Sequence, residues 1–412
     1  MKKRPASTLD PKKIKSAAFV IEEDLLKHNL ERLNYIKDQS GCKMFQALKT
    51  WSTWPLFGIT KKYLDGTEVS SLNEAKLGYE KFNHSVHMFA PAYKEEEFNE
   101  ILKYCSTIIF NSFSQWKKFK PAVSKFVKKT GLKRECGLRI NPEYTGKDEH
   151  SGLWSPCAPG SRLGVRISEF KEALKTDPKA LDGISGFHFH IFFDKTFEDL
   201  KEGLKAVEDK FGEYFAGRKW INFGGGQKMT DDDYDVDGLI KLVKNFQQKY
   251  HVTVHMEPGA VIVKCAGVLV SSVLDVVERD DVPYKIAILD MSFNAHTPDF
   301  LLSTDLDMPV TGATIIRDES KIKKNSNTYQ LAGGTCVTGD KLLGQYHLFK
   351  NPLKAGDKVL MEDGIQYNLV QCTMFNGVQH PDIVLWKKNS KGKYGPKLIR
   401  KFTFEDFKKR MG

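Results

Sequence analysis

The sequence lacks the features that would place a protein in a membrane or outside a cell. No run approaches the roughly 20 apolar residues that a membrane helix needs. The stretch 1–15 is basic and polar with no apolar run behind it, unlike a secretory signal. We therefore expect a cytoplasmic protein with no membrane partner. Hydrophobic residues make up 41% and charged residues 28% of the 412 residues, as in ordinary globular proteins of two or three domains.

Cysteine is sparse and shows no pairing pattern. Seven cysteines are scattered along the chain, and no CxxC pair occurs. The odd count and the wide spacing argue against a disulfide framework and against a structural zinc site. We expect reduced thiols and no bound metal.

The charge is basic but not concentrated. Lysine and arginine number 63 against 52 aspartates and glutamates, a net charge of +11. Because the lysines are spread along the chain and no zinc-finger or RNP motif accompanies them, a solvated surface explains them better than nucleic-acid binding. We expect no nucleic-acid partner.

What the sequence does contain is a regular alternation of short β-type runs with helical patterns. Strands that alternate with helices indicate βαβ units and a parallel sheet. Eight such units over roughly 210 residues predict an α/β fold with a (β/α)8 TIM barrel. The predicted strands are Met44–Leu48, Thr67–Val69, Val86–Phe89, Thr107–Phe110, Gly137–Ile140, Gly186–His190, Trp220–Phe223 and Thr253–Met256. The predicted helices include Ser71–Lys81, Glu95–Tyr104, Ser114–Lys128, Glu198–Phe211 and Val236–Tyr250.

The pattern changes after about residue 260, where β-branched runs dominate. We expect a barrel over residues 22–260 and a second, mostly β domain from residues 1–21 and 261–412. The long stretch 141–165, rich in Pro, Gly and Ser, interrupts the barrel and is expected to be functional. The strands expected in the second domain are Ala17–Ile21, Val261–Val277, Tyr284–Leu289, Thr328–Leu331, Lys358–Met361 and Ile383–Lys387.

Chemically useful residues follow the ends of several predicted barrel strands, where TIM barrels carry their active sites. They are Lys49, the pair His188 and His190, the triplet Gly224–Gly226, and Glu257. Each alone is more often a solvated lysine, a structural histidine, a turn or a strand exit. Their joint placement at one mouth of the barrel favours a functional site.

These residue types together fit one cofactor, pyridoxal 5'-phosphate (PLP). The amine of Lys49 can form a Schiff base with an aldehyde, and a glycine turn such as Gly224–Gly226 can bind a phosphate through backbone N–H groups. A carboxylate such as Glu257 can keep a pyridinium nitrogen protonated. A ring such as that of His188 can stack on the cofactor.

The same segments resemble the ornithine and diaminopimelate decarboxylases, PLP enzymes with the alanine-racemase-like barrel (fold type III). The resemblance implies that Lys49 carries the cofactor, that His188 stacks on its ring and that Glu257 meets its nitrogen. It also implies that Cys336 reaches the active site of the opposite subunit in a homodimer. The segments that carry it are Ala47-Leu48-Lys49, Phe187-His188, Gly224–Gly226, Glu257-Pro258-Gly259, Gly334-Thr335-Cys336 with Asp340, and Tyr367 with Phe375-Asn376-Gly377.

A narrower resemblance links the chain to the carboxynorspermidine/carboxyspermidine decarboxylases of polyamine and spermidine biosynthesis. It rests on residues 47–56 (ALKTWSTWPL), 70–78 (SSLNEAKLG), 137–144 (GLRINPEY), 156–164 (PCAPGSRLG) and 187–190 (FHFH). Three places depart from it. Ala260 stands where ornithine decarboxylases have a phosphate-binding arginine, and residues 191–193 and 302–308 are unfamiliar. The phosphate must then rely on Gly224–Gly226, Tyr367 and His190.

The resemblance implies a carboxy-lyase reaction on a carboxylated triamine. Loss of the α-carboxylate leaves a carbanion, which Cys336 protonates as a general acid; the alternative for Cys336 is a buried apolar thiol. We expect Asp340 to bind the distal ammonium groups, with Glu74 and Asp299 as weaker candidates. Arg162 meets a carboxylate or braces the site.

Two other functions stay open at this point. One is a sister decarboxylase for diaminopimelate, ornithine or arginine, against which His190 and the loop 156–164 argue. The other is a catalytically silent PLP-binding homologue. It is disfavoured because Lys49, Glu257 and Cys336 are all present.

Overall fold

The computed structural model describes residues 3–146, 155–191, 195–302 and 306–412. They form two compact units, one from Leu30–Val261 and one from the chain before Leu30 together with Ile262–Gly412. The expected division lay at residues 22 and 260. The first boundary falls later because strand β1 (Ala18–Glu22) continues directly into helix α1 (Glu23–Ser40), so the division lies inside a helix.

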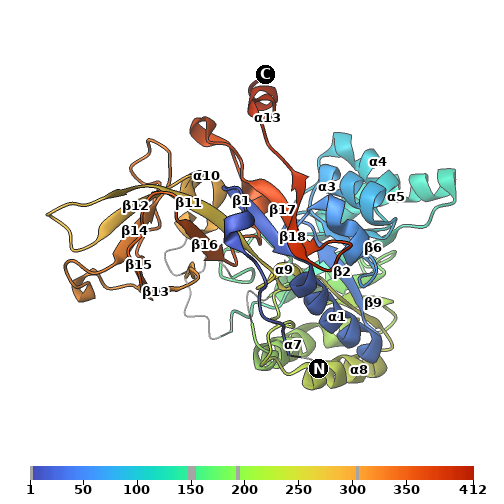
Figure 1. Cartoon of the computed structure of the whole chain (residues 1–412). Coiled ribbons are helices and arrows are strands. Elements are labelled where there is room, and N and C mark those ends of the chain that lie inside the picture. Colours follow the sequence, from blue (N-terminus) through green and yellow to red (C-terminus); the bar gives the residue numbers. More distant parts are fainter. Residues whose placement is uncertain (1–2, 147–154, 192–194, 303–305) are drawn as a thin grey trace. The chain divides into compact units, whose positions relative to one another are not determined.

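Within the described residues, the first unit is a closed barrel of eight parallel strands (Figure 1). Neighbouring strands pair in chain order, and the last pairs back onto the first at His255–Lys43 and Met256–Met44. This confirms the predicted TIM barrel. The strands are β2 (Lys43–Ala47), β3 (Gly66–Val69), β4 (Val86–Phe89), β5 (Thr107–Phe110), β6 (Glu135–Asn141), β8 (Gly186–His188), β9 (Trp220–Asn222) and β10 (Thr253–Met256), with β7 (Val165–Arg166) beside β6.

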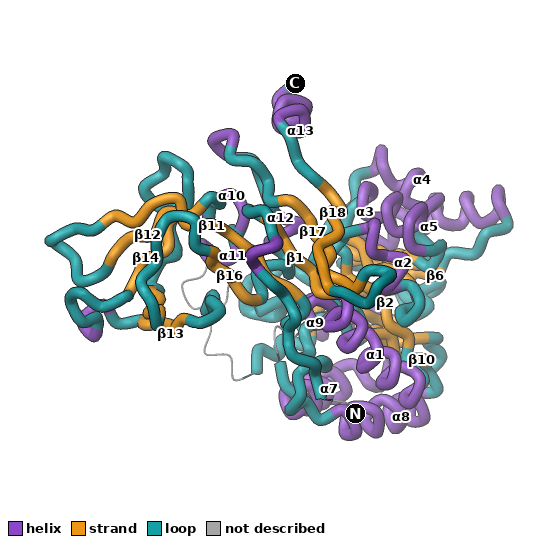
Figure 2. The backbone as a smooth tube through the Cα atoms, viewed as in Figure 1, coloured by secondary structure: helices purple, strands orange, loops and turns teal. Residues whose placement is uncertain are grey.

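Helices connect these strands and cover the outside of the barrel (Figure 2). Several begin at a side-chain cap: Ser112 accepts the N–H of Gln115, and Asp235 that of Gly238. Such caps satisfy backbone donors that the first turn leaves free. The helices are α2 (Phe57–Thr60), α3 (Leu72–Leu77), α4 (Glu95–Tyr104), α5 (Phe113–Thr130), α6 (Ile167–Thr176), α7 (Phe197–Phe211), α8 (Val236–Tyr250) and α9 (Ala260–Val263).

Aromatic rings fill the barrel interior below the carboxyl ends of the strands. Trp220 is fully buried, and a Cβ added at Gly137 or Gly186 would lie 2.4 or 2.3 Å from its ring. Two glycines on neighbouring strands therefore make room for one indole. His255 stacks on Trp220 at 5.3 Å, and His87 stacks on Phe45 at 3.7 Å between ring centroids.

The second unit is a nine-stranded sheet in the order β13-β15-β14-β12-β11-β1-β17-β18, with β16 paired to β11. The N-terminal strand β1 pairs with β11 on one side and β17 on the other. The strands are β11 (Gly267–Val277), β12 (Lys285–Leu289), β13 (Ala313–Ile316), β14 (Thr328–Ala332), β15 (Tyr346–Phe349), β16 (Lys358–Glu362), β17 (Asp382–Lys388) and β18 (Tyr394–Arg400). Short helices complete it: α10 (Phe293–His296), α11 (Asp299–Leu302), α12 (Asn368–Gln371) and α13 (Phe404–Met411).

One expected strand is wrong at its start. Residues 261–263 were expected to be extended, but they lie in helix α9, and the strand begins only at Gly267. The β preference of Val and Ile is weak and yields to position in the fold. Gly267 pairs so closely with β1 that an added Cβ would lie 2.2 Å from the Val20 carbonyl oxygen. Among the residues described, no helix has both the length and the apolar character needed to cross a membrane.

Candidate functional site

Ionisable side chains gather at the carboxyl ends of the barrel strands. Lys49 follows β2, His188 ends β8 and Glu257 follows β10. The ammonium group of Lys49 acts on the pKa values of Glu74, His188 and Glu257, so the structure brings these predicted residues into one electrostatic cluster. This is the edge at which parallel strands of a TIM barrel present catalytic groups.

Glu257 is a buried but ionised carboxylate. Its Oε1 accepts a 2.7 Å hydrogen bond from the amide of Asn222, and its Oε2 lies 3.4 Å from His188 Nε2. Burial raises the pKa of the Glu257 carboxyl, but the hydrogen bond from His188 and the charge of the Lys49 ammonium outweigh it, so the pKa falls well below its ordinary value. Burial lowers the pKa of His188. A neutral imidazole therefore faces a charged carboxylate.

The glycine turn after β9 is built so that only glycine fits. Gly224 and Gly226 have φ of +66° and +91°, a region that L side chains rarely adopt. A Cβ on Gly225 would lie 2.3 Å from the Glu257 carbonyl oxygen. The backbone of this turn thus packs directly against the residue that carries the carboxylate.

Two amides of the turn already have hydrogen-bond partners within the protein. The Gly224 N–H donates to Asn222 Oδ1 at 2.8 Å, and the Gly225 N–H donates to His190 Nδ1 at 3.0 Å. These side chains satisfy donors that would otherwise be buried and unpaired. Burial lowers the pKa of His190 well below its ordinary value. Its ring is therefore neutral and carries its proton on Nε2.

Sequence reasoning missed Glu68, a second buried carboxyl of the cluster. Its backbone oxygen accepts the N–H of Leu48, the residue before Lys49, at 3.0 Å. Glu68 is 2% exposed, and its Oε2 has no hydrogen-bond partner among the described residues. Burial, helped by the charge of Glu257 and opposed by Lys49, raises its pKa to about 8. An acidic residue inside a buried β run was the signal that could have revealed it.

Arg139 on β6 was also missed. It is 5% exposed, its guanidinium lies 4.5 Å from the Phe89 ring, and Nη2 donates to the His190 carbonyl oxygen at 3.2 Å. Burial lowers its pKa to about 10, so it is a buried cation at neutral pH. A lone arginine within the run Gly137–Ile140 was the available signal.

Glu74 makes hydrogen bonds that stabilise the start of helix α3. Its Oε2 accepts the N–H of Ser70 at 2.7 Å, and Ser71 Oγ accepts the N–H of Glu74 at 3.2 Å. The Ser71 hydroxyl therefore caps the first turn of α3, and the Glu74 carboxylate binds the N–H of the residue before that cap. Burial raises the pKa of Glu74, while the Ser70 N–H and the Lys49 charge oppose that rise.

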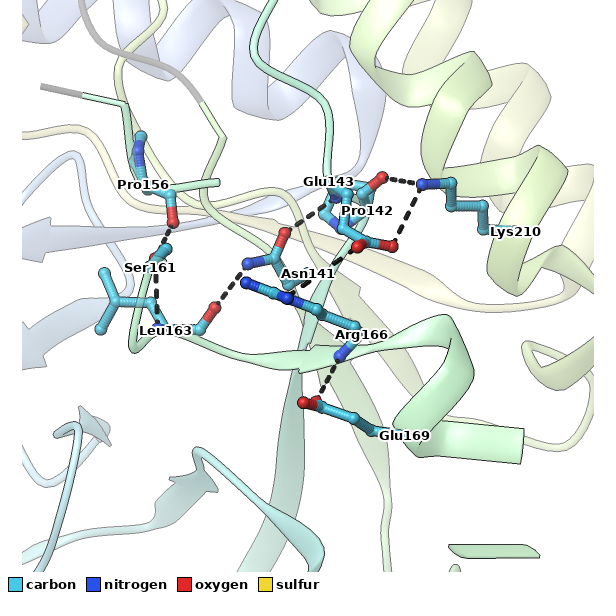
Figure 3. A network of polar contacts seen from close by, with 9 residues as sticks. All are labelled: Asn141, Pro142, Glu143, Pro156, Ser161, Leu163, Arg166, Glu169 and Lys210. Atoms are coloured by element: carbon cyan, nitrogen blue, oxygen red, sulfur yellow. Dashed lines mark hydrogen bonds and ion pairs between the residues drawn. The ribbon is translucent and has the colours of Figure 1, made fainter. Parts of the chain in front are cut away.

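The loop 141–165 is held by its own polar contacts (Figure 3). Asn141 Nδ2 donates to the Leu163 carbonyl oxygen at 2.9 Å, and Asn141 Oδ1 accepts the Glu143 N–H at 2.8 Å. Lys210 of α7 donates to the Pro142 carbonyl oxygen at 2.6 Å and lies 3.4 Å from Glu143. The described ends of the loop are therefore tied to the barrel.

Ser161 and Arg162 hold the far end of the same loop. Ser161 Oγ donates to the Pro156 carbonyl oxygen and accepts the Leu163 N–H at 3.2 Å. The Arg162 carbonyl oxygen accepts from Asn111 at 2.8 Å, and its side chain is exposed. Ser161 is structural. Residues 147–154, Phe192, Phe193 and residues 303–305 of the unfamiliar 302–308 stretch lie outside the described residues.

The second unit carries the other predicted residues, among them Asp340. Asp340 was expected to bind substrate ammonium groups. It is 3% exposed, and its carboxylate accepts from Thr335 Oγ1 and N–H at 2.6 and 3.0 Å, from Ser292 Oγ at 3.1 Å and from the Asn294 N–H at 3.1 Å. Four donors occupy its oxygens. Asp340 instead organises the loop that exposes Cys336.

Tyr367 and Asp299 also belong to the second unit. Tyr367 has φ of +59° and stands immediately before α12. Asp299 begins α11, and burial raises its pKa although Gln371 opposes that rise by a hydrogen bond. Both side chains are half-buried.

Comparison with known proteins shows which family the chain belongs to. Residues 34–365 match the family model described as "Pyridoxal-dependent decarboxylase, C-terminal sheet domain". The carboxynorspermidine/carboxyspermidine decarboxylase of Campylobacter jejuni is 36% identical over 96% of this chain and 98% of its own length. The chain belongs to the pyridoxal-dependent decarboxylases.

Two further comparisons give a second similar relative and a similar solved structure for this pyridoxal-dependent decarboxylase. The carboxyaminopropylagmatine decarboxylase of Synechocystis is also 36% identical, over 96% of this chain and 95% of that protein. A crystal structure of carboxynorspermidine decarboxylase from Campylobacter jejuni, complexed with norspermidine, matches with a TM-score of 0.82 and covers 96% of this chain and all of that one. These matches agree with the predicted fold, carboxy-lyase class and PLP cofactor.

Proposed function

We propose that this pyridoxal-dependent decarboxylase acts on carboxynorspermidine or carboxyspermidine and releases norspermidine or spermidine. Two relatives so named share 36% and 31% identity over 96% of the chain. The observation that carries the chemistry is Glu257, a buried carboxylate kept ionised beside Lys49 and the glycine turn.

The residues of the barrel mouth fit PLP in its three chemical parts. Lys49 supplies the amine for the aldehyde carbon. Glu257 supplies the carboxylate for the ring nitrogen, and His188 supplies a neutral ring for stacking. The turn Gly224–Gly226 leaves no room for a Cβ and lets a phosphate approach its backbone, with the Nε2–H of His190 as a further donor. The family resemblance, and not a contact in the structure, is the reason to propose Tyr367 as a further phosphate ligand.

Bound PLP supplies an electron sink for the pair of electrons left when the α-carboxylate departs as carbon dioxide. Glu257 holds the proton on the ring nitrogen, because an ionised carboxylate favours the protonated pyridine. Lys49 would hold PLP through its side-chain amine when no substrate is bound. Cys336 of the partner subunit delivers a proton to the α-carbon as a general acid.

The substrate ends need charged partners outside the cofactor site. With Asp340 committed to its own loop, we propose Asp299 and Glu74 for the distal ammonium groups and Arg162 for a carboxylate. Burial raises the pKa of Asp299 and of Glu74. A cationic substrate would reverse that effect and restore their charge.

We also propose a cytoplasmic homodimer with shared active sites. The dimer follows from the role given to Cys336, whose loop is exposed. All seven cysteines are free thiols, which suits a reducing compartment. Neither proposal depends on the charge of the chain.

A second substrate, carboxyaminopropylagmatine, is favoured by one specific observation. A relative named for its decarboxylation is as similar to this chain as the carboxynorspermidine enzyme, at 36% identity. The two substrate types differ at one end, where agmatine carries a guanidinium and the triamines carry an ammonium. A site built for one polar end group can reject the other strongly.

Carbon dioxide release by the PLP-loaded protein tests the proposal. Carboxynorspermidine, carboxyspermidine, carboxyaminopropylagmatine, diaminopimelate and ornithine are offered separately, with Lys49→Ala as the control. We expect release from the carboxylated triamines, lost in the control. Release only from the agmatine derivative would move the enzyme to that substrate, and release only from diaminopimelate or ornithine would contradict the proposal.

A further inference from the structure

Asn222, the last residue of β9, lies between the two ends of the proposed cofactor site. It is fully buried. Its Nδ2 donates to Glu257 Oε1 at 2.7 Å, and its Oδ1 accepts the Gly224 N–H at 2.8 Å. One side-chain amide therefore joins the carboxylate proposed for the ring nitrogen to the turn proposed for the phosphate.

A backbone hydrogen bond closes this contact into a ring. The Glu257 N–H donates to the Gly224 carbonyl oxygen at 2.8 Å. Asn222, Gly224 and Glu257 are thus linked pairwise by three hydrogen bonds. The orientation of the amide is determined, because only its NH₂ can donate to a carboxylate and only its oxygen can accept from a backbone N–H.

The chemistry at this position calls for an uncharged donor that is also an acceptor. An aspartate would retain the acceptor for Gly224 but would set a second carboxylate 2.7 Å from Glu257, where like charges in a buried site oppose ionisation. An aliphatic residue would leave the Gly224 N–H and a charged Glu257 oxygen without partners, which is costly in a buried site.

We propose that Asn222 is a positioning residue that holds the phosphate turn and the ring-nitrogen carboxylate in one fixed relation. The inference deepens the proposed function and rests on the placement of PLP at Lys49. Asn222 does not touch the reacting atoms but acts through Glu257 and Gly224. Its consequence is that binding at the phosphate end and binding at the ring-nitrogen end are coupled.

Three variants separate this role from general stability. Asn222→Asp keeps the bond to Gly224 and loses the one to Glu257, whereas Asn222→Ala loses both. Asn83→Asp is the matched control. Asn83 also bridges two groups, donating to the Asp65 carbonyl oxygen and accepting the Ser85 N–H, both at 2.9 Å. It does so before β3 and β4, at the opposite end of the barrel.

The readouts are the dissociation constants of PLP and of inorganic phosphate for the apoprotein, and hydrogen exchange of the Gly224 amide. We expect Asn222→Asp to weaken PLP binding by roughly ten- to a hundredfold, the worth of a hydrogen bond to a charged group, with phosphate affinity nearly unchanged. The pH dependence of its PLP affinity should also differ from that of the wild type. Asn222→Ala should weaken both ligands and speed exchange at Gly224, while Asn83→Asp changes none of these.

PLP affinity in both Asn222 variants equal to that of Asn83→Asp would overturn the inference. Fast exchange of the Gly224 amide in the wild-type holoprotein would overturn it without any variant, should one fail to fold. If the wild type itself binds no PLP, the proposed function fails and this inference fails with it. Wild-type binding together with unaffected variants removes only the role of Asn222.

Discussion

Glu68 and Glu257 are buried carboxyls of the same barrel mouth, and they hold opposite protonation states at neutral pH. The pKa of Glu68 is raised to about 8, whereas that of Glu257 falls well below its ordinary value. Asn222 and His188 surround Glu257 with polar contacts, but Glu68 Oε2 has no hydrogen-bond partner in the part of the chain that the structure describes. One site thus contains one acid and one carboxylate.

The first prediction concerns Glu68→Gln, which imitates the protonated acid. Because folding raises this pKa from 4.5 to about 8, the unfolded chain loses the proton first. The wild type therefore loses stability as the pH rises from about 5 to about 8. Glu68→Gln should remove this loss in thermal melts recorded across that range. A melt profile that keeps the wild-type slope would contradict the assignment, and Glu96→Gln at an exposed position of α4 is the control.

We expect the barrel to lose folding stability in acid because two buried histidines lie below the site. Burial lowers the pKa of His87 to about 3 and that of His255 to about 4, from 6.5. Their stabilising contribution is present above about pH 6.5 and is lost as the pH falls through 4, because only the unfolded chain then takes up protons. His87→Phe, which keeps the stack on Phe45, should flatten the decline of Tm between pH 6.5 and 4. The exposed His251→Asn control should keep it.

Asp340→Asn tests whether the Asp340 carboxylate organises the Cys336 loop. Replacing a carboxylate that accepts four hydrogen bonds should destabilise the Cys336 loop by about 1–3 kcal/mol. We expect faster hydrogen exchange at Thr335 and Asn294 and an altered alkylation rate of Cys336. Asp318→Asn is matched, since Asp318 also accepts an N–H and a hydroxyl from one residue, Ser320. If hydrogen exchange and Cys336 alkylation are both unchanged, Asp340 does not organise this loop and remains a candidate for binding the substrate ammonium groups.

Gly186→Ala should strain the barrel interior. The new Cβ would lie 2.3 Å from both the ring and the carbonyl oxygen of Trp220, and overpacking of a filled core costs about 1–3 kcal/mol. Urea unfolding measures this cost. Gly58→Ala in α2 is the control, because nothing lies within 4 Å of its Cβ position. A Gly186→Ala protein as stable as wild type would mean that the indole can move aside.

The barrel was readable from the sequence because its strands are short, buried and regularly spaced. Predicted and observed bounds agree within two residues for all eight barrel strands, and β4, β5 and β10 agree fully. In the second unit β13, β15 and β18 were missed. The β signal of β18 is weak because the strand contains Gly395, Pro396 and exposed positions. The strands β13 and β15 are only four residues long.

The candidate site could be predicted where a residue of a chemically informative type follows the end of a strand, as Lys49 and Glu257 do. Glu68 and Arg139 were not predicted as site residues because each is a single charged residue inside a β run. The burial of their side chains is apparent only in the folded barrel. Asp340 is the converse case. Its motif with Thr335 is visible in the sequence, but the donors Ser292 Oγ and Asn294 N–H come from a segment that only folding brings close.

The most direct test of the central claim is to locate the covalently bound cofactor. Borohydride reduction of the PLP-loaded protein makes the lysine–cofactor bond permanent, and peptide mapping by mass spectrometry then identifies the lysine. The account predicts a single labelled peptide carrying Lys49, and no label in Lys49→Arg. Label on another lysine, or none in a protein loaded with PLP, would contradict the placement of the active site at the barrel mouth.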